Sequence, residues 1–145
     1  MNTMKTGNAE NTEISQNSQK EFNEITREVI GAAVEVQKAL GIGLLESAYA
    51  AALEIELKSR KIYYEREVPV RASYKNQDIG VVYRADLIVE DELIVEIKAV
   101  DTLLDIHKAQ LLTYLRLTKL PVGLLLNFHD ISVAKSAKRL INNWY

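Results

Sequence analysis

The chain has 145 residues and a mass of 16.4 kDa, which is the usual size of one domain. It is 48% hydrophobic and 26% charged, so its composition predicts a packed core and excludes a wholly disordered chain. The lack of cysteine excludes disulfides, thiolate metal sites and cysteine nucleophiles, and only two histidines, His107 and His129, are present. A net charge of −2 does not by itself indicate a nucleic-acid-binding protein.

The distribution of apolar residues bears on the cellular location of the protein. No apolar run approaches the roughly 18 residues of a membrane span, and the N-terminus lacks the apolar segment of a signal peptide. We therefore expect a cytoplasmic protein with no membrane partner. Residues 1–20 are rich in Asn, Thr, Ser and Gln, which predicts a disordered polar tail, and residues 21–145 are expected to form a single domain.

Two helices are predicted first. From Glu21 to Leu40 apolar residues recur every three or four positions, and Gly41 and Gly43 end this pattern. A second helix is expected from about Leu44 to Arg60.

The apolar period then changes to two, which indicates strands over 64–74, 81–89 and 93–99, with a polar turn over 75–78. A third helix is expected over 104–118 and a buried strand over 122–128, while 131–145 is ambiguous between a strand and a short helix. This order predicts an α/β (α+β) fold in which helices flank a mixed sheet, and the first three strands of that sheet form an antiparallel meander.

The hairpin over 81–99 is the most informative segment. Its odd positions are apolar, whereas Arg84, Asp86, Glu96 and Lys98 occupy even positions. Because side chains alternate faces along a strand, the four charged residues are expected to share one face. A three-residue loop over 90–92 would place Asp86 opposite Glu96 and Arg84 opposite Lys98, with Cβ atoms about 4.5–5.5 Å apart.

This charged face has two interpretations. Two carboxylates about 5 Å apart in a partly covered site repel each other unless a cation joins them, and Mg²⁺ leaves positions for water and phosphate oxygen. Lys98 would then orient or deprotonate an attacking water, or stabilise charge on phosphorus. Alternatively, Arg84 with Asp86 and Lys98 with Glu96 form a cross-strand cluster of salt bridges on a solvent-facing surface.

Residues on the predicted helices also allow two interpretations. Glu46 begins the second helix, where it either favours the helix dipole or adds a carboxylate at the metal. Tyr49, one turn on, would be an ordinary half-buried aromatic. Gln110 and Tyr114 are four residues apart and share a helix face, either as surface residues or as contacts to a phosphate backbone.

Three motifs in one order resemble a known superfamily. The segment 43–49 (GLLESAY) matches the motif that names the GxxExxY protein family. The segment 83–86 (YRAD), followed by 96–98 (EIK), resembles the D…ExK core of the PD-(D/E)XK nuclease superfamily. The segment 110–114 (QLLTY) is similar to the QxxxY element of its RecB-like and lambda-exonuclease-like branch. Gln37 stands where many relatives carry a histidine.

The resemblance implies a restriction-endonuclease-like core and hydrolysis of phosphodiester bonds in nucleic acid, with DNA favoured, dependent on Mg²⁺ or Mn²⁺. Asp86 and Glu96 would be the main metal ligands, helped by the Ile97 carbonyl and by Glu46, and Lys98 would be the catalytic lysine. Residues expected to support the site or bind nucleic acid are Gln110, Tyr114, Arg84 and Tyr49. The alternative is a non-catalytic nucleic-acid- or protein-binding module that retains the fold. A homo-oligomer or a protein partner would supply specificity.

Overall fold

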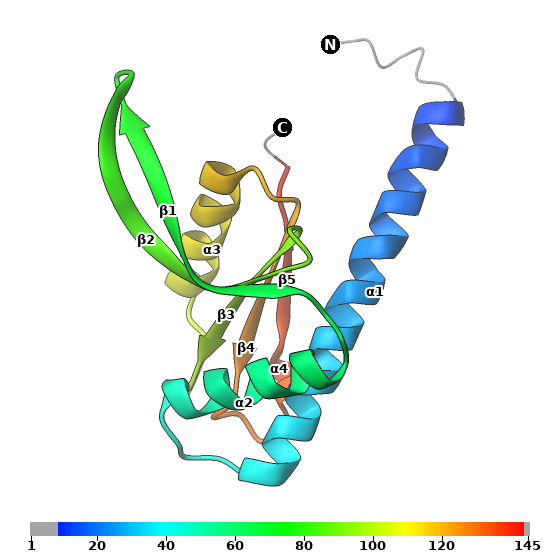
Figure 1. The fold of residues 1–145 in the computed structure, drawn as a ribbon, viewed down its shortest axis with the longest axis vertical. Coiled ribbons are helices and arrows are strands. Elements are labelled where there is room, and N and C mark those ends of the chain that lie inside the picture. The colour runs from blue at the N-terminus through cyan, green and yellow to red at the C-terminus, as the bar shows by residue number, and fades with distance from the viewer. Residues whose placement is uncertain (1–8, 144–145) are drawn as a thin grey trace.

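The structure of the chain is a computed structural model that describes residues 9–143, with side chains from residue 23 onward. Four helices and five strands follow one another along this part of the chain (Figure 1). In chain order they are α1 (Ala9–Leu40), α2 (Glu46–Ser59), β1 (Tyr64–Tyr74), β2 (Gln77–Val89), β3 (Leu93–Lys98), α3 (Asp105–Thr118), β4 (Val122–Asn127), α4 (Val133–Ser136) and β5 (Lys138–Ile141).

The five strands form one mixed sheet in the order β1-β2-β3-β4-β5. The first three strands are an antiparallel meander, β4 runs parallel to β3, and β5 is antiparallel to β4. Helix α3 supplies the crossover that a parallel pair of strands requires. The predicted mixed sheet with a three-stranded meander and flanking helices is therefore confirmed.

Helix α1 begins twelve residues earlier than the apolar pattern indicates, because residues 9–20 continue it. This stretch was expected to belong to the polar tail. Adding a residue to an existing helix costs less than starting a new one, and 9–20 contain glutamates, glutamines and a lysine but no glycine or proline. The rest of the expected tail, residues 1–8, lies outside the described residues.

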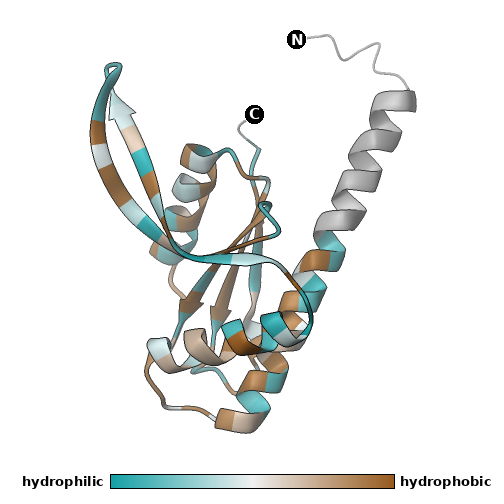
Figure 2. Cartoon of the chain, in the orientation of Figure 1, coloured by the Kyte–Doolittle hydropathy of each residue, from teal (hydrophilic) through white to brown (hydrophobic). Residues whose placement is uncertain are grey.

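Both faces of the central strands are buried. Helices α1 and α2 cover one face, where the packed side chains of the hairpin are Leu87, Val89, Leu93, Val95 and Ile97. Helix α3 covers the other face, where Ile88, Ile94 and Leu125 meet Leu111 and Leu115. Strands buried on both sides are continuously apolar, as the brown colour of β3 and β4 in Figure 2 shows.

Helix α3 lies very close to β4 at Gly123. A Cβ atom built on Gly123 would lie 2.8 Å from Leu111 Cγ. Real Cβ atoms essentially never approach another atom so closely, so only glycine allows this helix to pack at this distance from the sheet.

The β1–β2 hairpin is longer than predicted. Lys75 and Asn76 have φ angles of 50° and 64°, which form the two-residue turn that suits the twist of a hairpin. Strand β2 therefore begins at Gln77 and not at Val81, because the polar residues 77 and 78 pair with β1 instead of belonging to the turn. The outer half of the hairpin extends beyond the other strands (Figure 1).

The ambiguous C-terminal stretch contains both a short helix, α4, and a strand, β5. Gln37 of α1 holds the connection before them. Its Nε2 donates to the carbonyls of Phe128 (3.3 Å) and Asp130 (2.7 Å), and its Oε1 accepts from the Val133 N–H (3.0 Å). Among residues 9–143, no helix has the length and apolar character that crossing a membrane requires.

Candidate active site

Strand β2 pairs with β3 only from Leu87 to Val89, and this pairing does not reach Asp86. Leu87 faces Val95, Ile88 faces Ile94 and Val89 faces Leu93, which is the predicted register. The expected pair of Arg84 with Lys98 does not form, because the strands have separated at that point. Arg84 is instead paired along the sheet with Pro69 of β1.

The carboxylates of Asp86 and Glu96 occupy the place where the strands separate. Asp86 Oδ2 accepts a hydrogen bond of 2.7 Å from the Ile97 N–H, and Glu96 Oε2 accepts one of 3.2 Å from the Asp86 N–H. Each carboxylate thus binds the main chain of the opposite strand, where a carbonyl would bind in a continuous ladder. This exchange ends the ladder and holds both acids in one gap.

The separation also changes which side chains share a face. Tyr83 and Ala85 were expected on the same face as Leu87, but they pack on the α3 side with Ile88 and Ile94. Leu87 packs on the α1 and α2 side. The alternation of faces therefore shifts at Asp86. The prediction that all odd positions share one face holds from Leu87 onward and is wrong for Tyr83 and Ala85.

Strand β1 is interrupted at the same level by Glu67. Arg66 faces Leu87 and Val68 faces Ala85, so Glu67 would face Asp86, but it has no partner in the register. Glu67 has a φ of 48°, a left-handed conformation that is uncommon for a residue other than glycine, asparagine or aspartate, and rarer still inside a strand. Strand β2 consequently loses regular pairing on both of its edges at Asp86.

Tyr83 is a site residue that the sequence analysis mentioned only as part of a motif. Its hydroxyl donates to Glu96 Oε1, and its ring stacks on the ring of Tyr114 with centroids 3.5 Å apart. Tyr114 of α3 therefore reaches the site through Tyr83 and supports the position of Glu96. The YRAD motif contained this signal, because a tyrosine three residues before the aspartate can approach the partner strand.

The electrostatics of the gap favour proton or cation binding. Burial, followed by the nearby charge of Asp86, raises the pKa of Glu96 to about 7. Burial also raises the pKa of Asp86, while the Ile97 N–H and the Lys98 ammonium act in the opposite direction. Two acids whose pKa values rise through burial gain free energy from a shared positive charge.

Lys98 lies two residues beyond Glu96 at the end of β3. Its carbonyl accepts a hydrogen bond of 2.9 Å from the Phe128 N–H, which fixes the main chain. Asn127, a buried polar residue at the end of an apolar strand, holds the next turn through bonds of 3.0 and 2.8 Å to the N–H and carbonyl of Val100. Within residues 9–143, the Lys98 ammonium forms no hydrogen bond or ion pair, so it is available to a ligand.

The loop before α2 places Glu46 above the end of β3. Gly43 has a φ of 102°, which glycine adopts without strain. The buried Tyr49 donates from its hydroxyl to the Gly41 carbonyl (2.7 Å) and accepts from the Leu44 N–H (3.2 Å). Tyr49 therefore holds the loop and does not face solvent. Glu46 Oε2 accepts from the Ala99 N–H at 3.2 Å.

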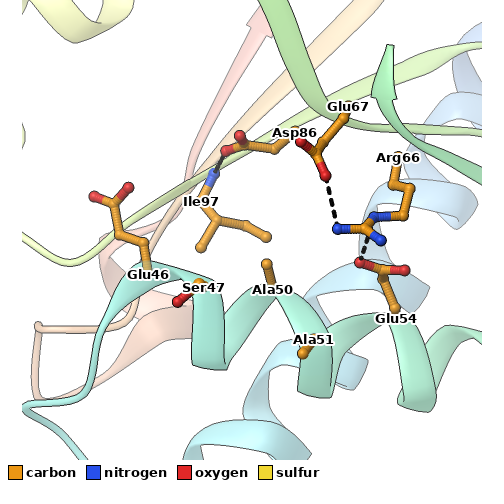
Figure 3. Close-up of a pocket in the computed structure, with 9 residues that line it drawn as sticks. All are labelled: Glu46, Ser47, Ala50, Ala51, Glu54, Arg66, Glu67, Asp86 and Ile97. Carbon is orange, nitrogen blue, oxygen red and sulfur yellow. Dashed lines mark hydrogen bonds and ion pairs between the residues drawn. The ribbon is translucent and has the colours of Figure 1, made fainter.

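A pocket of about 320 Å³ opens beside this gap, between α2 and the three strands of the meander (Figure 3). Asp86, Ile97 and Glu46 line it, together with Ser47, Ala50, Ala51, Glu54, Arg66 and Glu67. Arg66 contacts Glu54 at 3.4 Å and Glu67 at 2.7 Å across one end of the pocket. Of the two carboxylates in the gap, Asp86 lines the pocket and Glu96 does not.

The donor set suits a hard divalent cation in its chemistry, since carboxylate oxygens are the ligands that Mg²⁺ prefers. Within residues 9–143, however, no three acidic or histidine side chains are grouped closely enough to hold a metal ion. Asp86 and Glu96 are the pair that meets in the gap, and Glu46 lines the same pocket as Asp86.

Two predicted site residues stay at the edge of this arrangement. Gln110 is exposed on α3, one turn before Tyr114, and Arg84 is exposed on β2. Neither forms a hydrogen bond or ion pair with another residue of the described part of the chain. His107 lies in the first turn of α3, where its Nδ1 accepts a hydrogen bond of 3.0 Å from the Leu104 N–H.

Comparison with known proteins assigns the chain to one class of protein. Residues 23–140 match the family model described as PD-(D/E)XK nuclease superfamily, which covers most of the chain. The chain therefore belongs to the PD-(D/E)XK nuclease superfamily, and its five-stranded mixed sheet with flanking helices is a restriction-endonuclease-like core. Searches of curated proteins and of solved structures found no significant match. Membership of the GxxExxY family stays a prediction.

Proposed function

We propose that this protein is a metal-dependent nuclease that hydrolyses phosphodiester bonds of nucleic acid, with DNA as the favoured substrate. One observation supports it most directly: the carboxylates of Asp86 and Glu96 meet in a buried gap, with the free ammonium of Lys98 two residues away. The cytoplasmic location and the GxxExxY assignment belong to the same proposal.

Each residue has a distinct part in this proposal. Asp86 and Glu96 would hold Mg²⁺ or Mn²⁺, with Ile97 and Glu46 beside them, and Tyr83 would keep Glu96 in place. The cation supplies positive charge that polarises the phosphate and lowers the pKa of a bound water. Lys98 would donate to a phosphate oxygen or orient the attacking water from its fixed position at the end of β3.

The proposal is tested by cleavage of plasmid, linear duplex, single-stranded DNA and RNA, with Mg²⁺ and with EDTA. Asp86→Asn and Lys98→Met are each expected to lower the rate at least about a hundredfold, because each removes a group that acts on the transition state. The matched controls Asp91→Asn and Lys38→Met change exposed residues and should keep the rate of the unmodified protein. Cleavage that persists in EDTA, or in both site variants, would contradict the proposal.

A binding module without catalysis is the second candidate, and the lack of a group of three metal-ligating side chains among residues 9–143 favours it. Calorimetry with Mn²⁺ separates the two functions. The nuclease predicts heat of binding that Glu96→Gln abolishes, whereas the binding module predicts no metal binding even with nucleic acid present. Light scattering would show whether a homo-oligomer forms.

A further inference from the structure

The outer half of the β1–β2 hairpin, residues 71–84, is a ribbon that we call the arm. It curves away from the rest of the sheet (Figure 1). Since β3 separates from β2 at Asp86, within the described residues the arm is two strands wide. Eleven of its fourteen residues are exposed, so the body of the protein does not cover it.

The arm exposes apolar side chains. Tyr74 is 65% exposed, Ile79 57% and Val82 45%, and Figure 2 shows brown segments along the ribbon. An isolated two-stranded ribbon is marginally stable in water, so this surface favours a partner. The register shifts twice, leaving one extra residue on β2 at each shift. Such bulges twist an edge and oppose the addition of a strand from a second copy of the chain.

The charge of the arm favours a polyanion. It carries three cations (Arg71, Lys75 and Arg84) and one acid, Asp78, in a chain whose total charge is −2. Arg71 pairs with Asp78 at 2.6 Å. Lys75 and Arg84 have no acidic partner among the described residues, and Lys75 Nζ lies 5.5 Å from the centre of the Tyr74 ring. One uncompensated cation therefore lies at the tip of the arm and the other near its base.

The arm is also continuous with the site. Strand β2 runs without a break from Gln77 at the tip to Asp86. At about 3.3 Å per residue this stretch is roughly 30 Å long, close to one turn of a B-form duplex. The major groove, about 12 Å wide, admits a two-stranded β-ribbon.

We propose that the arm binds a nucleic-acid duplex on one side of the phosphate that the site receives. Arg84 contacts a backbone phosphate next to the site, Lys75 contacts one about a turn away, and Tyr74 and Ile79 lie against the groove. This inference rests on the proposed function for the nature of the ligand. It adds that the arm is the surface that holds the duplex, and that the bound duplex extends along the arm to one side of the cleaved bond.

The test measures binding of a duplex of about 25 base pairs, somewhat over two turns, by fluorescence anisotropy with Ca²⁺ in place of Mg²⁺. The double variant Lys75→Ala/Arg84→Ala is expected to bind at least about tenfold more weakly. The slope of log K against log salt should fall by about two, since each lost phosphate contact contributes about 0.9. The control Arg27→Ala/Lys38→Ala removes the same charges from exposed positions on α1 and should keep the slope. Circular dichroism checks that both variants fold.

The outcomes separate the arm from the nuclease proposal. If the unmodified protein cleaves and binds the duplex but the arm variant keeps the slope of the control, the arm inference is overturned and the nuclease proposal stands. A single strand of equal length that binds as tightly, with the same dependence on Lys75 and Arg84, would overturn the choice of a duplex. If the unmodified protein neither cleaves nor binds any nucleic acid, both proposals fail.

Discussion

Glu96 is only 3% exposed, and its carboxylate forms no ion pair with a residue of the described part of the chain, although the nearby charge of Lys98 acts to lower its pKa. The carboxylate receives the hydroxyl of Tyr83 and the N–H of Asp86, which are neutral donors. Burying a charge without a countercharge is unfavourable, so the metal-free protein is expected to hold a proton at this position near neutral pH. The stability of the metal-free protein should therefore depend on pH through Glu96, and Asp86, whose pKa burial also raises, acts in the same direction.

In metal-free buffer the free energy of unfolding should fall as the pH rises from about 4.5 to about 7. The pKa of Glu96 is about 7 in the folded protein and 4.5 in the reference state, so the folded protein binds a proton that the unfolded chain releases. The full effect is about 3 kcal/mol. Urea denaturation at a series of pH values in EDTA measures it.

Glu96→Gln should remove most of this pH dependence, while Glu65→Gln, at an exposed position of β1, should retain it. A curve for the unmodified protein as flat as that of Glu96→Gln would show that Glu96 is not the group responsible.

Tyr83→Phe removes the hydroxyl that donates to Glu96 and keeps the ring that stacks on Tyr114. This hydrogen bond holds the pKa of Glu96 down, so the variant should need a higher pH to ionise the acid. We expect the acid limb of the pH–rate profile for cleavage to shift to higher pH, with a rate loss of about tenfold at neutral pH.

The control is Tyr114→Phe, whose hydroxyl forms no hydrogen bond with the described residues. Its profile should match that of the unmodified protein. A profile for Tyr83→Phe that keeps its midpoint while the rate falls would assign the tyrosine a purely structural role.

At the scale of elements, the loop over 41–45 determines where α2 begins and where Glu46 points. Tyr49→Phe should destabilise the protein by about 0.5–1.5 kcal/mol, because the hydrogen bonds of its hydroxyl to the Gly41 carbonyl and the Leu44 N–H are lost. Cleavage should also fall as Glu46 loses its fixed position. Thermal denaturation and rate measurements check the two effects.

The exposed Tyr74 provides the matched control, since Tyr74→Phe changes the same atom at a position that is 65% exposed. Equal stability of the two variants would show that the Tyr49 hydroxyl does not hold the loop.

Elements with a clear apolar pattern were predictable almost to the residue. Strand β1 has the expected bounds, and α3 begins one residue later than expected, at Asp105. The register of the three pairs that form between β2 and β3 also followed from the apolar pattern. Element bounds and strand register depend on residues that are close together in the sequence, so the apolar pattern predicts them.

The details of the site depend on contacts between distant segments and were not predictable. The alternation of side chains placed Arg84 opposite Lys98. It could not show that the carboxylates of Asp86 and Glu96 bind the main chain of the opposite strand and separate the two strands. The left-handed conformation of Glu67 is likewise imposed by its surroundings and not by its residue type. Two signals were accessible: Tyr83 in the YRAD motif, and Asn127 as a single polar residue at the end of an apolar strand.

At the scale of the whole molecule, the distance between α3 and the sheet depends on Gly123. Gly123→Ala should destabilise the protein by about 1–3 kcal/mol, because the new methyl group meets Leu111 in a packed layer. Chemical denaturation of this variant, of Leu111→Ala and of the double variant completes a thermodynamic cycle. The double variant should lose clearly less than the sum of the single losses, since the smaller residue 111 makes room for the methyl group. Strict additivity would contradict this packing.

The two interruptions of pairing at Asp86, one on each edge of β2, also have a mechanical meaning. A sheet with continuous pairing resists bending, whereas β2 has no regular ladder partner on either edge at Asp86. The Ile97 N–H keeps the Asp86 carboxylate attached to the body at this same point. We therefore expect the sheet to bend more easily at Asp86 than where its pairing is continuous, while the carboxylate keeps its bond to β3.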